Sequence, residues 1–145
     1  SLRASKAAIA EFGRVRVRIG DRVPEAMRAL RDGLAAWAVE NGVGLLFGRV
    51  GLAGMEPDAH ADVLTHLYYR HLAPRPMRPR AMPHRYIEMR RLDRDEIDAA
   101  AVAPALPPFL AAMLEAGAVV GDGAIVDPGL GRVDVAVVLA VGASV

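Results

Sequence analysis

Apolar and charged residues alternate strictly over residues 14–19, where an arginine stands at every second position. A period of two is typical of a strand with one buried face and one face in solvent. Near the end of the chain, residues 133–141 are apolar at nearly every position. Such a run is typical of a strand that is covered on both faces. We expect a second copy of the chain to supply part of that cover, which predicts a homodimer.

A period of three to four residues predicts an amphipathic helix over residues 24–40. Pro24 suits the first turn of this helix, because proline lacks an N–H that the first turn leaves unpaired. We expect the buried stripe of the helix to consist of Met27, Leu30, Leu34 and Trp37. Farther along, Asp93 is followed three residues later by Glu96, a spacing that predicts a capping box at a second helix start.

The same periods, applied to the whole chain, predict a mixed series of elements. In order, these are strand 14–19, helix 24–40, strand 43–50, helix 56–72, an extended Arg/Pro loop over 73–83, strand 85–92, a proline-interrupted helix from 93, a second helical piece at 109–116, and strand 133–141. With the middle helix set aside, the order is β-α-β-β-α-β, which is that of ferredoxin-like sheets. We therefore expect a single α+β domain over residues 1–145, with a ferredoxin-like sheet, an extra helix and a long Arg/Pro loop.

Composition narrows the class of protein further. The chain has 145 residues, of which 53% are hydrophobic, and this suits one folded domain. It contains no cysteine, which excludes disulfide frameworks, zinc–thiolate sites and thiol nucleophiles. No apolar run reaches the ~20 residues of a membrane helix, and no signal-peptide pattern opens the chain. We therefore expect a cytoplasmic protein without a membrane partner. Because the chain begins with Ser1, we expect its start to be a cloning remnant or a cut within a longer protein.

Positive charge is concentrated in the middle of the chain. The net charge is only +1, but eight arginines fall within residues 70–94, against Glu88 and Asp93 alone. The planar guanidinium group pairs well with phosphate and carboxylate oxygens. We predict that the ligand-binding residues are Arg75, Arg78, Arg80, Arg85, Arg90 and Arg91. The function predicted from them is a non-catalytic binding or regulatory domain that needs no cofactor and takes an anionic ligand, a nucleic acid or an acidic partner.

A second group of residues favours an enzyme instead. Asp93 and Asp95 stand at the expected helix start, and Asp122 lies within residues 115–127, which read EAGAVVGDGAIVD. These two segments resemble the C-terminal part of RusA-type Holliday junction resolvases. The resemblance implies a magnesium-dependent nuclease in which Asp93, Asp95 and Asp122 hold the metal, in keeping with the preference of Mg²⁺ for carboxylate oxygens. The nuclease is the alternative to the binding domain, and the sequence leaves both open.

Other familiar catalytic motifs are absent from the chain. It has no P-loop, no G-x-G-x-x-G, no G-x-S-x-G and no H-E-x-x-H. Its serines lie near the ends, at Ser1, Ser5 and Ser144, so we do not expect a serine nucleophile.

Overall fold

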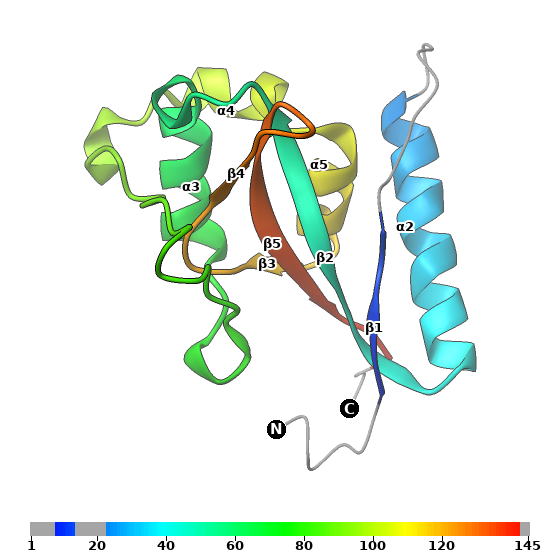
Figure 1. Ribbon diagram of the computed structural model, residues 1–145. Coiled ribbons are helices and arrows are strands. Elements are labelled where there is room, and N and C mark those ends of the chain that lie inside the picture. Colours follow the sequence, from blue (N-terminus) through cyan, green and yellow to red (C-terminus); the bar gives the residue numbers. More distant parts are fainter. Residues whose placement is uncertain (1–7, 14–22, 143–145) are drawn as a thin grey trace.

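A computed structural model of the chain describes residues 8–13 and 23–142 (Figure 1). The strands are β1 (Ala8–Glu11), β2 (Val43–Ala53), β3 (Val119–Val120), β4 (Ile125–Asp127) and β5 (Arg132–Ala140). The helices are α2 (Val23–Glu40), α3 (Ala61–His71), α4 (Ala99–Ala105) and α5 (Pro108–Glu115). Short 3₁₀ turns form at Pro57–His60, Arg75–Met77 and Arg94–Glu96. The elements build a single open sheet with accompanying helices, so the predicted α+β class is confirmed.

The last strand lies at the centre of the sheet. The strand order is β1-β2-β5-β3, and β4 also pairs with β5. β1 and β2 run parallel and are joined through α2, as a crossover between parallel strands requires. β5 runs antiparallel to β2, β3 and β4, and its register with β2 extends from Leu45↔Ala140 to Ala53↔Arg132.

This order differs from the ferredoxin-like order that the sequence predicted. The expected strand over residues 85–92 forms only an isolated bridge between Ile87 and Ala124. The backbone N–H groups of Arg91 and Leu92 donate instead to the buried hydroxyl of Thr65, at 3.1 Å each, so a side chain takes the place of a neighbouring strand. Residues 8–11 form a strand that was not expected. The expected strand over residues 14–19 lies outside the described residues.

β5 is buried within one chain. Val135 is 1% exposed and Val138 is 4% exposed, although the two side chains point to opposite faces of the sheet. The homodimer prediction assumed that a partner had to cover one of these faces. That assumption is wrong, because segments of the same chain bury both residues. Self-association itself stays a prediction.

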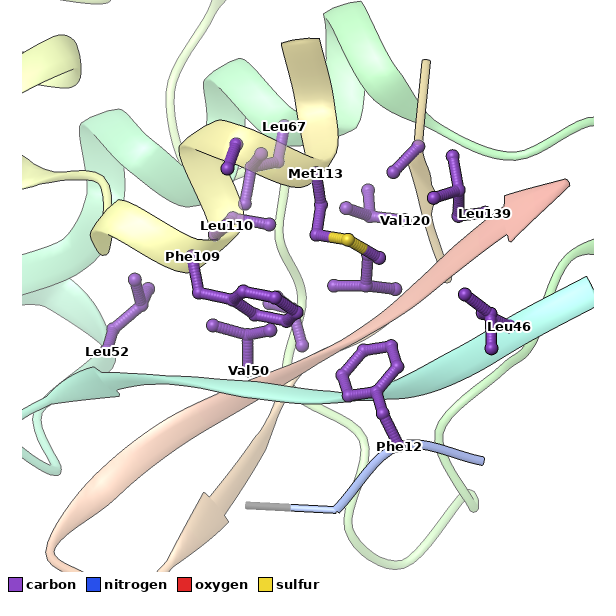
Figure 2. Close-up of a cluster of buried hydrophobic side chains, with 14 of the residues drawn as sticks. Phe12, Leu46, Val50, Leu52, Leu67, Phe109, Leu110, Met113, Val120 and Leu139 are labelled. Carbon is purple, nitrogen blue, oxygen red and sulfur yellow. The ribbon is translucent and has the colours of Figure 1, made fainter. Parts of the chain in front are cut away.

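The core lies between one face of the sheet and the helices. Leu110 and Met113 of α5 point toward β2 and β5, with Leu67 of α3 behind them (Figure 2). Phe12, which follows β1, meets Phe109 edge to face, with ring centroids 5.5 Å apart. The odd-numbered valines of β5 complete this cluster, so the even-numbered residues of β5 point to the other face of the sheet.

The predicted helix at 24–40 is confirmed as α2, but its buried stripe is narrower than expected. Met27 is buried and Leu34 is partly buried against the core. Leu30 and Trp37 are 38% and 49% exposed, so the prediction that Trp37 lies in the core is wrong. α2 packs against α5 and β2, and these contacts leave part of its apolar stripe uncovered. No helix within the described ranges is long and apolar enough to cross a membrane.

Candidate functional site

Charged residues gather on the face of the sheet opposite the core. Asp134 and Ala136 of β5 lie on this face, together with Arg49 of β2, which pairs in register with Ala136. A cavity of about 220 Å³ opens there. Its lining combines charged and apolar side chains: Arg49, Arg80, Arg85, Asp122, Asp134, Pro79, Ala81, Met82, Gly123, Ile125 and Ala136.

Asp134 is a buried carboxylate in the lining of this cavity. Its side chain has no exposed surface. Oδ1 lies 2.5 Å from Nε of Arg132, and Oδ2 lies 3.7 Å from a terminal nitrogen of Arg49. A buried charge is costly unless it is paired, and here two guanidinium groups compensate one carboxylate. A Cβ atom at Gly51, the residue opposite Asp134 on β2, would overlap the Arg132 side chain, so the glycine makes room for the pair.

Asp122 is the second carboxylate of the cavity, and its side chain is 17% exposed. Oδ1 accepts a hydrogen bond of 2.7 Å from the phenol of Tyr86. Burial, together with this hydrogen bond, raises the pKa of Tyr86 to about 12, so the phenol keeps its proton at neutral pH and remains the donor. Oδ2 lies 4.0 Å from the nearest nitrogen of Arg80, whose side chain is 69% exposed. That distance is too long for a hydrogen bond.

The segment 79–86 forms the outer wall of the cavity and is fixed to the sheet by its backbone. The N–H of Asp122 donates to the carbonyl of Pro79 at 2.8 Å, and the N–H of Ala81 donates to the carbonyl of Asp122 at 3.0 Å. These bonds hold the wall in position directly beside the Asp122 carboxylate.

Tyr86 is held in place by a glycine. Its ring lies against Gly123, where a Cβ atom would overlap the ring. Gly123 also has a φ of +89°, a backbone conformation that favours glycine. The guanidinium of Arg80 also lies over the Tyr86 ring, 5.0 Å from its centre. The close packing against Gly123 therefore helps to position the donor that orients Asp122.

A second cavity, of about 470 Å³, adjoins the first. Its lining consists of Glu11, Phe12, Gly13, Arg49, Asp127, Gly129, Leu130 and Arg132. Because Arg49 lines both cavities, the two lie side by side over β2.

The six arginines predicted to bind a ligand differ in their relation to the first cavity. Only Arg80 and Arg85 line the first cavity. The other four lie elsewhere: Arg75, Arg78, Arg90 and Arg91. Nε of Arg78 donates to a backbone carbonyl at 2.7 Å, and Arg91 forms an ion pair with Asp58. Arg78 and Arg91 therefore bind groups of the chain itself.

The aspartates of the nuclease alternative do not form a metal site. Over residues 8–13 and 23–142, no group of three or more His, Cys, Asp or Glu side chains is arranged to hold a metal ion. Asp93 instead begins the Arg94–Glu96 turn, where its N–H donates to Glu96 at 2.8 Å. The predicted capping box is therefore present, but the helix that was expected to start there begins only at Ala99, with Asp98 as its N-cap. Asp95 is exposed in the Arg94–Glu96 turn, and Asp122 is bound to Tyr86.

The chain resembles acyltransferases. It is 33% identical over 137 residues to the L-ornithine N(alpha)-acyltransferase of Rhodobacter capsulatus, a match that covers 92% of this chain and 51% of that protein. It is 30% identical over 129 residues to the protein of the same name from Brucella abortus, over 89% of this chain and 46% of the relative. The chain thus spans about half the length of the curated relatives it matches. No protein-family model and no solved structure matches it.

These relatives contradict both functions that the sequence predicted. Four similar curated proteins are all named L-ornithine N(alpha)-acyltransferase, whereas we expected a non-catalytic anion-binding domain or a magnesium nuclease. The physical reasons are those given above: the arginines contact several separate parts of the chain, and the aspartates cap a turn or bind a tyrosine.

Sequence reasoning missed the buried group at the sheet, which consists of Asp134, Arg49 and Arg132. One signal was present. Asp134 is the sole charged residue within the apolar run 133–141, and a carboxylate inside a buried strand needs a partner. Nothing in the sequence identified Arg49 as that partner, because the two residues meet only through the register of β2 and β5.

Proposed function

We propose that this chain forms the acceptor-binding part of an N-acyltransferase, which transfers an acyl group to the α-amino nitrogen of an amino acid such as L-ornithine. The observation that carries the proposal is the similarity to proteins named for this activity over about nine-tenths of the chain. Because the chain spans about half the length of those proteins, the proposal assigns it one part of the site.

The first cavity supports this assignment by its charge and size. A free amino acid carries both ammonium and carboxylate groups, and the lining offers carboxylates and guanidiniums as partners. The cavity has a volume of about 220 Å³. That space suits a small polar metabolite such as a free amino acid. The cavity therefore fits the acceptor of the reaction.

The chemistry of N-acylation requires a neutral amine. Its lone pair attacks the carbonyl carbon of an activated acyl ester or thioester, so that a C–N bond forms, the bond to the leaving oxygen or sulfur breaks, and the nitrogen loses a proton. Nearby positive charge lowers the pKa of an amino group and so favours its reactive form. The cavity brings three guanidiniums, those of Arg49, Arg80 and Arg85, against two carboxylates. Its contribution to the reaction is to bind the amino acid and to favour the neutral α-amine.

An acyl-transfer assay tests the proposal. The chain is incubated with L-ornithine and acyl thioesters ranging from acetyl to palmitoyl, both alone and with the part of the Rhodobacter capsulatus relative that it does not cover. Mass spectrometry then detects N-acylornithine. We expect Arg49→Gln to lower the rate about 10- to 100-fold, the worth of a hydrogen bond to a charged group. The exposed Arg75→Gln serves as the matched control and should leave the rate unchanged. Failure to form N-acylornithine with every donor would refute the proposal.

A further inference from the structure

The two carboxylates of the first cavity differ in what already binds them. Asp134 lies between the guanidiniums of Arg132 and Arg49, which neutralise it. Asp122 receives a hydrogen bond from Tyr86, a neutral donor. The nearest cation, Arg80, is mostly exposed and lies beyond hydrogen-bond distance. The Arg80–Asp122 ion pair is therefore loose, and Oδ2 makes no hydrogen bond to it, which leaves acceptor capacity on Oδ2.

The position of this carboxylate is fixed before any ligand arrives. Tyr86 holds Oδ1, and the ring of Tyr86 is itself held against Gly123. The backbone of Asp122 is bonded to Pro79 and Ala81 on the outer wall. A carboxylate oriented in this way loses little freedom when a cation binds it, which favours affinity.

We propose that Asp122 binds the side-chain ammonium of a diamino acid and so directs acylation to the α-nitrogen. The inference rests on the function proposed above and names the substrate class of that site. Apolar residues of the lining, among them Ala81, Met82 and Ile125, suit the methylene chain between the two ends of such a ligand. Arg49, at the sheet, supplies a guanidinium for the α-carboxylate.

Regioselectivity follows from the charge of Asp122. A carboxylate next to an ammonium favours its charged form, so the side-chain nitrogen keeps its proton and has no lone pair for attack. An α-amine bound beside Arg49 would meet positive charge, which favours its neutral form. Only the α-nitrogen is then both neutral and free to attack the acyl carbonyl.

Binding without an acyl donor tests this inference separately from catalysis. Isothermal titration of the chain compares L-ornithine with L-norvaline, which has the same carbon chain without the side-chain amine. We expect ornithine to bind about 10- to 100-fold more tightly, as a hydrogen bond between charged groups predicts. Asp122→Asn should abolish this preference. Asp127→Asn, a change in a carboxylate of the neighbouring cavity, should keep it.

The wild-type comparison remains decisive even where Asp122→Asn fails to fold. Equal binding of ornithine and norvaline, or no binding of either, overturns the inference, and so does a folded Asp122→Asn variant that keeps the preference. Tyr86→Phe is a second variant, which removes the donor to Asp122 and should weaken the preference without abolishing it. A preference for ornithine that depends on Asp122, without any acyl transfer, refutes the proposed function and the directing of acylation, and it leaves only the binding of the ammonium by Asp122. Acyl transfer that is indifferent to Asp122 refutes this inference alone.

Discussion

On the polar face of the sheet, the stability of a charged residue depends on the opposite charges next to it. Asp134 has no exposed side-chain surface, and its nearest compensating group is Arg132. Arg49, the second cation, is farther away and half-exposed, with 52% of its side chain in solvent. The stability of this part of the sheet therefore depends mainly on Arg132.

Replacing Arg132 with methionine should destabilise the fold by about 3 kcal/mol, because it leaves a buried carboxylate without its main partner. The measurement is urea unfolding followed by circular dichroism. Arg28→Met is the matched control: it breaks the ion pair with Glu115, whose two side chains are each 47% exposed. Exposed pairs contribute little, so the loss there should be much smaller. Equal losses of unfolding free energy in the two variants would contradict a special contribution of the Arg132–Asp134 pair to stability.

Tyr86 should titrate far above an ordinary tyrosine. Its pKa is raised from 10.0 to about 12, first by burial and then by the hydrogen bond to Asp122. The folded protein holds this proton more tightly than the unfolded chain does, so the resulting stabilisation is complete below pH 10 and is lost as the pH rises from about 10 to 12. Ultraviolet absorbance of the wild type should show a phenol that titrates near 12 and is missing in Tyr86→Phe. If the wild-type phenol that disappears in Tyr86→Phe titrates near 10 instead, the Tyr86–Asp122 contact is not formed.

Among the elements, replacing a glycine with alanine should have opposite effects on stability in β2 and in α2. A Cβ atom at Gly51 would overlap Arg132, whereas one at Gly33 of α2 would meet nothing within 4 Å. Gly51→Ala should therefore cost about 1–3 kcal/mol through overpacking. Gly33→Ala should stabilise the helix by about 0.5–1 kcal/mol, because alanine loses less backbone entropy. Thermal unfolding measures both shifts, and an unchanged midpoint for Gly51→Ala would contradict the close packing of β2 against Arg132.

Helix α2 provides a second test, because its sequence period suggested more burial than the structure has. Trp37 is 49% exposed, so Trp37→Ala should cost less than about 1 kcal/mol. Phe109, which is 4% exposed, lies in the core, and Phe109→Ala should cost about 3–5 kcal/mol. Denaturant unfolding compares the two variants. A larger loss for Trp37→Ala would mean that the outer side of α2 is covered.

Hydrophobic period predicted elements well where burial alone decides the structure. It located α2, the strand that became β2, and the apolar run of β5. It failed where contacts between residues far apart in sequence determine the local structure. The backbone near Arg91 is bonded to Thr65 on α3, and no local pattern reveals a contact of this kind.

At the scale of the whole molecule, the cavity depends on chain segments that are far apart in sequence. Arg49 comes from β2, the outer wall from residues 79–86, and Asp122 and Asp134 from the end of the chain. The sequence indicated Asp122, Arg80 and Arg85 individually, but for other roles. Sheet order and register bring them together, and these features could not be read from a single sequence. The proposed function rests on similarity to proteins named as acyltransferases, which the residues alone did not suggest.

The proposed role of this chain is to bind the acceptor of an N-acyl transfer and to select it through Asp122. The most direct measurement is a competition between equal amounts of L-ornithine and L-norvaline for one acyl thioester, with the chain alone and with the uncovered part of the Rhodobacter capsulatus relative. Mass spectrometry gives the ratio of the two N-acyl products and the nitrogen that is acylated. We predict that α-N-acylornithine prevails by about 10- to 100-fold and that Asp122→Asn brings the ratio close to one. Equal products in the wild type, acylation of the side-chain nitrogen, or no product at all would contradict the account.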